Sequence, residues 1–273
     1  MKLNKKIINY YLVTVVLFVM TACGGGSKDS ISCSKITDSD SDGFHDEIDV
    51  APQEPFQNGN FSTPEKIINH PKIQRIIQIA KDHGITVRTD LEHNPPNLTG
   101  YYKAESGGII VDAQRADQIG RSFVAKENRI CAKKDYIETT NAAYSGGYFT
   151  KGIKIRGNGK YFTTYNLNSF NSSGCINYNV IIKSGKVNES GDITNIQRLK
   201  IILDYVEKSN GACPYIEHYW SVSSFVPEKK VTDLDELEYM CVDGKKAYVP
   251  GETWKNRDKE SCTCTKDVEI ECS

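Results

Sequence analysis

The sequence predicts a mainly β protein: an antiparallel meander closed into a barrel, preceded by two short helices and followed by a small disulfide-rich module. Two observations support this fold class. Between residues 85 and 226, apolar side chains recur at every second position, the period of a strand. Short segments rich in Gly, Ser and Asn separate these runs. We expect about eight to ten strands without intervening helices, and closure would remove the edges that promote aggregation.

The two helices are predicted at the start of the domain that spans residues 60–228. Thr63 is placed as an N-cap, and Pro64 occupies the first helical position. Pro71 begins the second helix, and Gly84 ends it. Apolar residues recur at helical spacing between them, so one face of this helix should pack on the meander.

Alternation is clearest in three of the predicted strands. The apolar residues are Ile153 and Ile155, then Ile176, Tyr178, Val180 and Ile182, then Leu199, Ile201, Leu203 and Tyr205. The polar residues between them are Lys154 and Arg156, then Asn177, Asn179 and Lys183, then Arg198, Lys200 and Asp204. We expect each strand to bury its apolar face and to expose its polar face to solvent.

The segment between the helices and the first long strand reads NPPNLTGYY over residues 94–102. A helix, this segment and then a meander resemble a set of uncharacterised bacterial lipoproteins with a predicted lipocalin-like barrel. The resemblance covers roughly residues 71–226. The Gly-x-Trp strand signature of lipocalins is absent, with Tyr101 or Tyr102 in place of Trp. The implied fold is therefore lipocalin-like in architecture only.

Such a barrel is either filled by its own side chains or holds one small ligand. The chain is rich in tyrosine, including Tyr161, Tyr165, Tyr178, Tyr205 and Tyr219. These rings could fill the core, or they could line an apolar pocket with polar tips. Both interpretations remain open, and the second makes the protein a carrier of an apolar small molecule.

The N-terminus predicts export and a membrane anchor. A short basic stretch and an apolar run form a signal peptide over residues 1–22. Residues 20–23 read MTAC, which resembles the lipobox of bacterial lipoproteins and implies a lipid on Cys23. The alternative is an ordinary cysteine near a standard cleavage site. Because Gly24, not Asp, follows Cys23, the family's sorting rule favours the outer membrane or cell surface.

A flexible tether over residues 23–37 leads into an acidic loop over residues 38–52. Carboxylates at loop positions 1, 3, 5, 9 and 12, a glycine at position 6 and a carbonyl at position 7 can surround one calcium ion. The predicted ligands are Asp38, Asp40, Asp42, Phe44 through its carbonyl oxygen, Asp46 and Asp49. The spacing resembles a single thrombospondin type 3 repeat. The alternative is a solvated acidic linker.

The C-terminal part contains four cysteines in a segment too small to fold on an apolar core alone. We expect a linker over residues 229–240 and a disulfide-rich module over residues 241–272. A zinc site is the alternative, although Cys262-Thr263-Cys264 has poor zinc-finger spacing. Paired cysteines are typical of an exported chain.

The tail, with Cys, Tyr, Gly-Glu-x-Trp, Cys-x-Cys and a final Cys, resembles the first subdomain of a von Willebrand factor type C module. That resemblance implies the pairs Cys241 with Cys264 and Cys262 with Cys272. Cys33, Cys131, Cys175 and Cys213 would then pair among themselves. The family also implies contact with an extracellular protein, whereas a disulfide-linked cap without a partner is the alternative.

Composition and motifs narrow the function classes. The net charge of −1 provides no basic surface for nucleic acid. The five histidines lack metal-binding spacing, and no nucleophile or phosphate-loop motif occurs, so we name no catalytic residue. The leading hypothesis is a non-enzymatic, membrane-anchored surface binding protein with a calcium-stabilised stalk. An apolar-ligand carrier and an enzyme of unrecognised type are the alternatives.

Overall fold

The structure is a computed structural model that describes residues 31, 33–41, 61–105, 107–122, 125–143, 146–172, 175–207 and 219–273. Contacts divide the chain into Met1–Ser30 and Ile31–Ser273, and every described residue belongs to the second unit. The predicted signal peptide and Cys23 therefore lie outside the described residues, as do Asp42, Phe44, Asp46, Asp49 and Cys213. Among the described residues, no helix combines the length and apolarity needed to cross a membrane.

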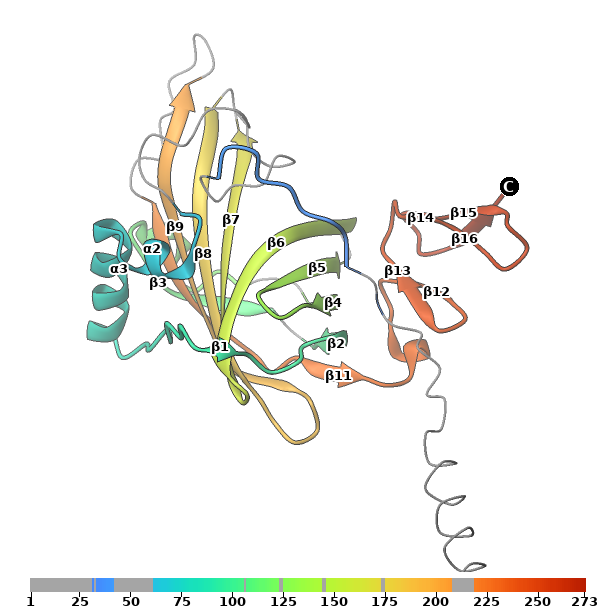
Figure 1. Ribbon diagram of the computed structural model, residues 1–273, viewed down its shortest axis with the longest axis horizontal. Helices are drawn as coiled ribbons and strands as arrows, with labels where there is room; N and C mark the ends of the chain where they lie inside the picture. The colour runs from blue at the N-terminus through green and yellow to red at the C-terminus, as the bar shows by residue number, and fades with distance from the viewer. Residues whose placement is uncertain are drawn as a thin grey trace, which may run out of the picture. The chain divides into compact units, whose positions relative to one another are not determined.

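The two predicted helices are present as α2 (Pro64–Ile68) and α3 (Pro71–Asp82). The Oγ1 of Thr63 accepts a hydrogen bond from the backbone N–H of Lys66 at 3.3 Å, which confirms the predicted N-cap. Both helices begin with proline and lie on the outside of a curled sheet (Figure 1).

The remaining elements are strands and two 3₁₀ turns, η1 (Ala116–Gln118) and η2 (Leu234–Glu236). The strands of the main sheet are β1 (His93–Asn94), β2 (Gly100–Ala104), β3 (Gly108–Ala113), β4 (Lys126–Ala132), β5 (Tyr136–Ala143), β6 (Gly146–Asn158), β7 (Tyr161–Ser172), β8 (Cys175–Val187), β9 (Ile193–Glu207), β10 (Trp220–Phe225) and β11 (Lys229–Val231). The C-terminal strands are β12 (Cys241–Asp243), β13 (Lys246–Tyr248), β14 (Thr253–Lys255), β15 (Ser261–Cys264) and β16 (Ile270–Cys272). The protein is mainly β, as the sequence predicts.

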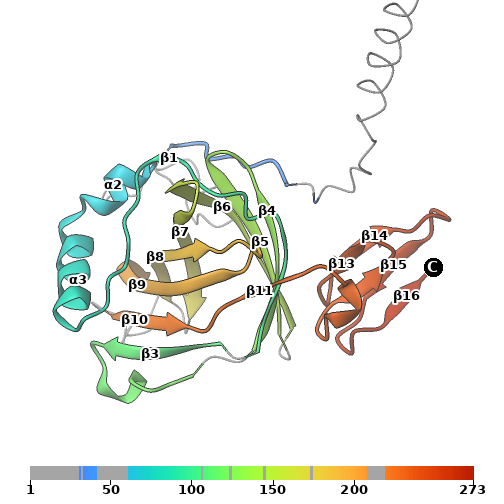
Figure 2. The same cartoon turned by 90° about the horizontal axis from the view of Figure 1, so that it is seen from below.

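The main sheet is a curled antiparallel meander in the order β11-β2-β4-β5-β6-β7-β8-β9-β10-β3, with β1 parallel to β6. In one ladder Lys103 of β2 lies opposite Lys229 of β11, and in another Gly108 of β3 lies opposite Phe225 of β10. Because β2 leads into β3 and β10 leads into β11, these two ladders join the first and last segments of the meander. Figure 2 shows the resulting barrel-like sheet curling around its interior.

The outer face of β7, β8 and β9 is apolar and lies under the helices. Tyr165, Val180 and Leu199 are fully buried, at 0 % exposure, and pack in one cluster with Ile73 and Ile76 of α3. The apolar residues of these strands point outward because α3 covers them there. The apolar face of the helix is buried against this face of the sheet in return.

The polar residues of the same strands consequently point into the curl. Asn177 is 0 % exposed and Asn179 is 1 % exposed, and the Nδ2 of Asn179 donates to the Oδ1 of Asn168 at 2.5 Å. The prediction that this polar face is exposed to solvent is therefore wrong for Asn177 and Asn179. Alternation shows that the two faces differ in polarity, but only the position of the helices decides which face lies inside.

The C-terminal region contains two disulfides and two small sheets. Disulfides join Cys241 to Cys264 and Cys262 to Cys272, the pairs that the family resemblance implies. A third disulfide joins Cys33 to Cys131 of β4, across 98 positions of sequence. The side chain of Cys175 and the whole of Cys213 are outside the described part of the chain.

The segment expected as a linker, residues 229–240, contributes β11 to the main sheet and then covers part of its outer face. Leu237 and Met240 are buried in a cluster with Tyr101 of β2 and Ala142 of β5. The Glu127 carboxylate of β4 is 0 % exposed and accepts hydrogen bonds from the backbone N–H groups of Glu238 at 2.7 Å and Tyr239 at 2.9 Å. These buried contacts attach the C-terminal region to the sheet.

A second polar contact reinforces that attachment. The Arg129 guanidinium of β4 lies 2.8 Å from the Glu252 carboxylate and donates to the carbonyl oxygen of Ala247 at 2.9 Å. Both charged side chains are mostly buried, at 14 % and 17 % exposure, so water screens this pair less than it would on the surface.

Candidate ligand-binding cavity

The interior of the curled sheet contains a cavity of about 230 Å³. Side chains from β4 through β9 line it, together with Leu98 and Glu228. The charged members are Lys126, Lys183, Arg198 and Glu228. Three cations and one carboxylate inside a barrel-like sheet are unusual, since charged groups are seldom buried unless they are paired or bind a ligand.

Glu228 forms the one ion pair of this cavity that the described residues show. Its Oε1 lies 2.8 Å from the Nζ of Lys183 on β8, and its side chain is 1 % exposed. Burial alone would raise the pKa of Glu228, but the ammonium groups of Lys183 and Lys126 together hold it below the usual value. Glu228 therefore stays ionised and neutralises one of the three cations.

Lys126 and Arg198 share an aromatic neighbour on β10. The Lys126 Nζ lies 5.8 Å from the centroid of the Phe225 ring, and the Arg198 Cζ lies 4.9 Å from it. Burial, reinforced by the charge of Lys183, lowers the pKa of Lys126 to about 8, and burial lowers the pKa of Arg198 to about 10. Both shifts mean that the cationic forms are poorly solvated in this interior.

The amide side chains around the cavity have unused hydrogen-bonding atoms. Within the described part of the chain, the Nδ2 of Asn128, the Oδ1 of Asn166 and the Oε2 of Glu228 are buried without a hydrogen-bond partner. Both terminal atoms of the buried Asn177 on β8, which does not line the cavity, lack one as well. Proteins normally satisfy buried polar groups, so these atoms indicate contacts with water or a ligand.

One side of the cavity is apolar. Ile130, Ile137, Ile153, Phe162 and Ile193 line it and belong to a buried cluster that also includes Leu98. The cavity therefore combines an apolar wall with a polar, cationic wall, which is the usual composition of a small-molecule site.

Three of the tyrosines that the sequence singled out, Tyr161, Tyr165 and Tyr178, do not line this cavity. Tyr165 and Tyr178 pack under α2 and α3, and the Tyr165 hydroxyl donates to the carbonyl oxygen of Asp90 at 2.7 Å. Tyr161 lies beneath the Arg88 guanidinium, which is 4.2 Å from its ring centroid. Lys183 and Arg198 lie opposite each other on the consecutive strands β8 and β9, but Lys126 is on β4, much earlier in the chain. Only the topology reveals that they share one interior.

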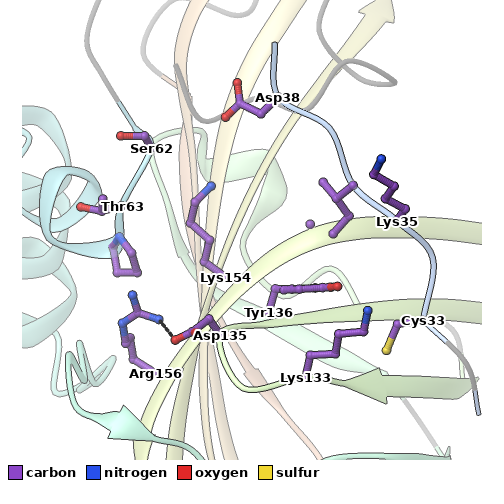
Figure 3. Close-up of a pocket in the computed structure, with 13 residues that line it drawn as sticks. Cys33, Lys35, Asp38, Ser62, Thr63, Lys133, Asp135, Tyr136, Lys154 and Arg156 are labelled. Atoms are coloured by element: carbon purple, nitrogen blue, oxygen red, sulfur yellow. Dashed lines mark hydrogen bonds and ion pairs between the residues drawn. The ribbon is translucent and has the colours of Figure 1, made fainter. Parts of the chain in front are cut away.

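A second pocket of about 540 Å³ lies on the outer face of the sheet, between the segment after Cys33 and the start of α2. Figure 3 shows Lys133, Lys154 and Arg156 around it, with Asp135 paired to the Arg156 guanidinium at 3.4 Å. Several of its charged residues, including Lys133 and Asp135, are exposed to solvent. Solvent screens such charges, so this pocket is a less selective site than the interior.

Asp38 lines this outer pocket, and it is one of the two predicted calcium ligands that the structure describes, Asp40 being the other. The described residues contain no group of three metal-ligating side chains. Since four of the six predicted ligands lie outside those residues, the calcium loop stays a prediction.

No protein-family model, curated protein or solved structure matches this chain. The architecture and the cavity are therefore the basis for a functional proposal.

Proposed function

We propose that the protein is a membrane-anchored, extracytoplasmic binding protein that holds a small ligand inside its barrel-like sheet. Export and the anchor rest on the signal peptide and lipobox residues, and the three described disulfides are consistent with an oxidising compartment. The ligand-binding role rests on the interior cavity.

The single observation that carries the proposal is the set of buried polar atoms without a partner around that cavity. An unsatisfied buried polar group costs about 1 to 3 kcal/mol. Apolar residues at Asn128 and Asn166 would fill the interior without this cost. A ligand with complementary polar atoms explains why a polar interior is kept.

Retention of a ligand can be tested on the full-length protein purified from its own host in detergent. Native mass spectrometry should show a bound mass that disappears after denaturation and solvent extraction. Asn166→Leu keeps the side-chain size but removes an unsatisfied carbonyl, so this variant should fold and lose most of the bound mass. Equal masses for the host-purified and extracted protein, with the extracted protein binding nothing from a host metabolite extract, would contradict the proposal.

The acidic loop is proposed to bind one calcium ion and stiffen the stalk beside the anchor. Clustered carboxylates repel one another unless a cation lies between them. Asp40→Ala with Asp42→Ala should abolish the calcium uptake that isothermal titration calorimetry detects in the wild-type protein. The double variant Asp235→Ala and Glu236→Ala removes two exposed acids elsewhere and should bind calcium normally. Unchanged uptake after the loop substitutions would rule out this site.

A further inference from the structure

The charges in the cavity restrict what it can bind. Lys183 is neutralised by Glu228 at 2.8 Å, and no carboxylate in the described part of the chain lies within ion-pair distance of the Lys126 ammonium. The charged groups that act on Lys126 are Lys183 of β8, Arg198 of β9 and Glu228, two cations against one anion. The field at Lys126 therefore disfavours its own charge and favours an added anion.

Size and shape narrow the ligand further. A volume of 230 Å³ equals about eight water molecules in liquid water. The apolar wall formed by Ile130, Ile137 and Phe162 favours a ligand with a hydrocarbon part. A free inorganic anion would leave that wall in contact with water, and a long acyl chain would exceed the volume.

One of the unused polar atoms belongs to Asn128, which is two residues from Lys126 on β4 and lines the same cavity. The Nδ2 of Asn128, on the same strand as Lys126, is a buried donor without an acceptor. An ionised carboxylate accepts several hydrogen bonds and matches an ammonium group beside an amide N–H. The Arg198 guanidinium lines the same cavity and adds a second positive charge.

We infer that the cavity binds a small organic carboxylate, with its anionic group against Lys126 and Asn128 and its hydrocarbon part against Ile130, Ile137 and Phe162. This inference rests on the proposed ligand-binding function and adds the chemical class and the orientation of the ligand. The bound carboxylate would neutralise a second of the three cations, after the one that Glu228 neutralises.

The probe is hexanoate, compared with hexanamide, which has the same length and no charge. Isothermal titration calorimetry on the full-length protein should show hexanoate binding and at least about tenfold weaker hexanamide binding, because losing one partner of a buried charge pair is costly. Lys126→Met should weaken hexanoate binding about tenfold or more. Lys133→Met, which removes an exposed lysine of the outer pocket, should leave it unchanged.

The pH dependence of hexanoate affinity shows whether Lys126 acts through its charge or only through its packing. As burial lowers the pKa of Lys126 to about 8, hexanoate affinity should fall as pH rises through that value, when the ammonium loses its proton. Lys126→Arg keeps a positive charge at all these pH values and should retain binding without that fall. Circular dichroism verifies that each variant is folded.

The outcomes distinguish the two claims. If hexanamide binds as well as hexanoate and Lys126→Met has no effect, the carboxylate inference fails while ligand binding stands. If neither probe binds, the inference fails. Native mass spectrometry of the host-purified protein then shows separately whether the cavity holds any ligand. Equal loss of affinity in the Lys126 and Lys133 variants would also overturn the assignment.

Discussion

Replacing Glu228 with glutamine should lower the free energy of unfolding by about 3 to 5 kcal/mol, the largest effect expected for one side chain in the cavity. The substitution keeps the size of the side chain but removes the charge that neutralises Lys183 at 2.8 Å. The ammonium of Lys183 is then left in an interior that already holds Lys126 and Arg198. Urea denaturation at neutral pH measures the loss.

The matched control is Glu105→Gln, because Glu105 pairs with Lys229 at 3.1 Å while both side chains are exposed, at 82 % and 70 %. Exposed pairs contribute about 0 to 1 kcal/mol, so this variant should unfold almost as the wild type does. Similar losses in the two variants would show that the interior is as well solvated as the surface.

The ion pair between Glu228 and Lys183 also makes the stability of the protein depend on pH. The pKa of Glu228 is held below its usual value of 4.5, so its contribution to stability is present above that value. It is lost as pH falls through the lowered pKa, because the unfolded chain binds the proton first. The difference in free energy of unfolding between the wild type and Glu228→Gln should therefore shrink in acid, where the two stabilities should converge.

Removing the disulfide between Cys33 and Cys131 is the second large effect. The bond closes a loop of 98 positions, and the chain-entropy relation assigns about 4.7 kcal/mol to a loop of that size. Cys33→Ala with Cys131→Ala should lower the melting temperature measured by differential scanning calorimetry without reductant. Alanine is preferred to serine because a serine hydroxyl at position 131, where Cys131 is 5 % exposed, would be buried without a partner.

The comparison is Cys262→Ala with Cys272→Ala, which opens a loop of only 10 positions and should cost roughly 2.7 kcal/mol by the same relation. This loss should be confined to the C-terminal region, because both cysteines belong to its small sheet of β14, β15 and β16. A larger fall in the main melting transition for this variant than for the first would contradict the loop-length argument.

The sequence predicts the local structure well because local signals determine it. Thr63, Pro64 and Pro71 place the two helices, and period-two alternation identifies β8 and β9. The cysteine spacing, through its family resemblance, leads to the two C-terminal pairs seen in the structure. These features depend on residues that lie close together along the chain.

The cavity could not be predicted because it depends on which face of each strand is covered. Asn177 and Tyr178 alternate identically whether the helices lie on one face or the other. Lys126 and Glu228 are separated by most of the meander and meet in one interior only because its first and last segments pair. The same applies to residues 229–240, whose polar composition suggests a linker although Leu237 and Met240 are buried.

The outward residues of β4 give this strand a mechanical role. Glu127 and Arg129 hold the C-terminal region, and Cys131, two positions further along, is covalently bonded to Cys33. A pulling force applied to the chain before Cys33 passes through this disulfide to Cys131 and so reaches the sheet at β4. The neighbouring strands β2 and β5 resist that force, because they hold β4 by hydrogen bonds along its length.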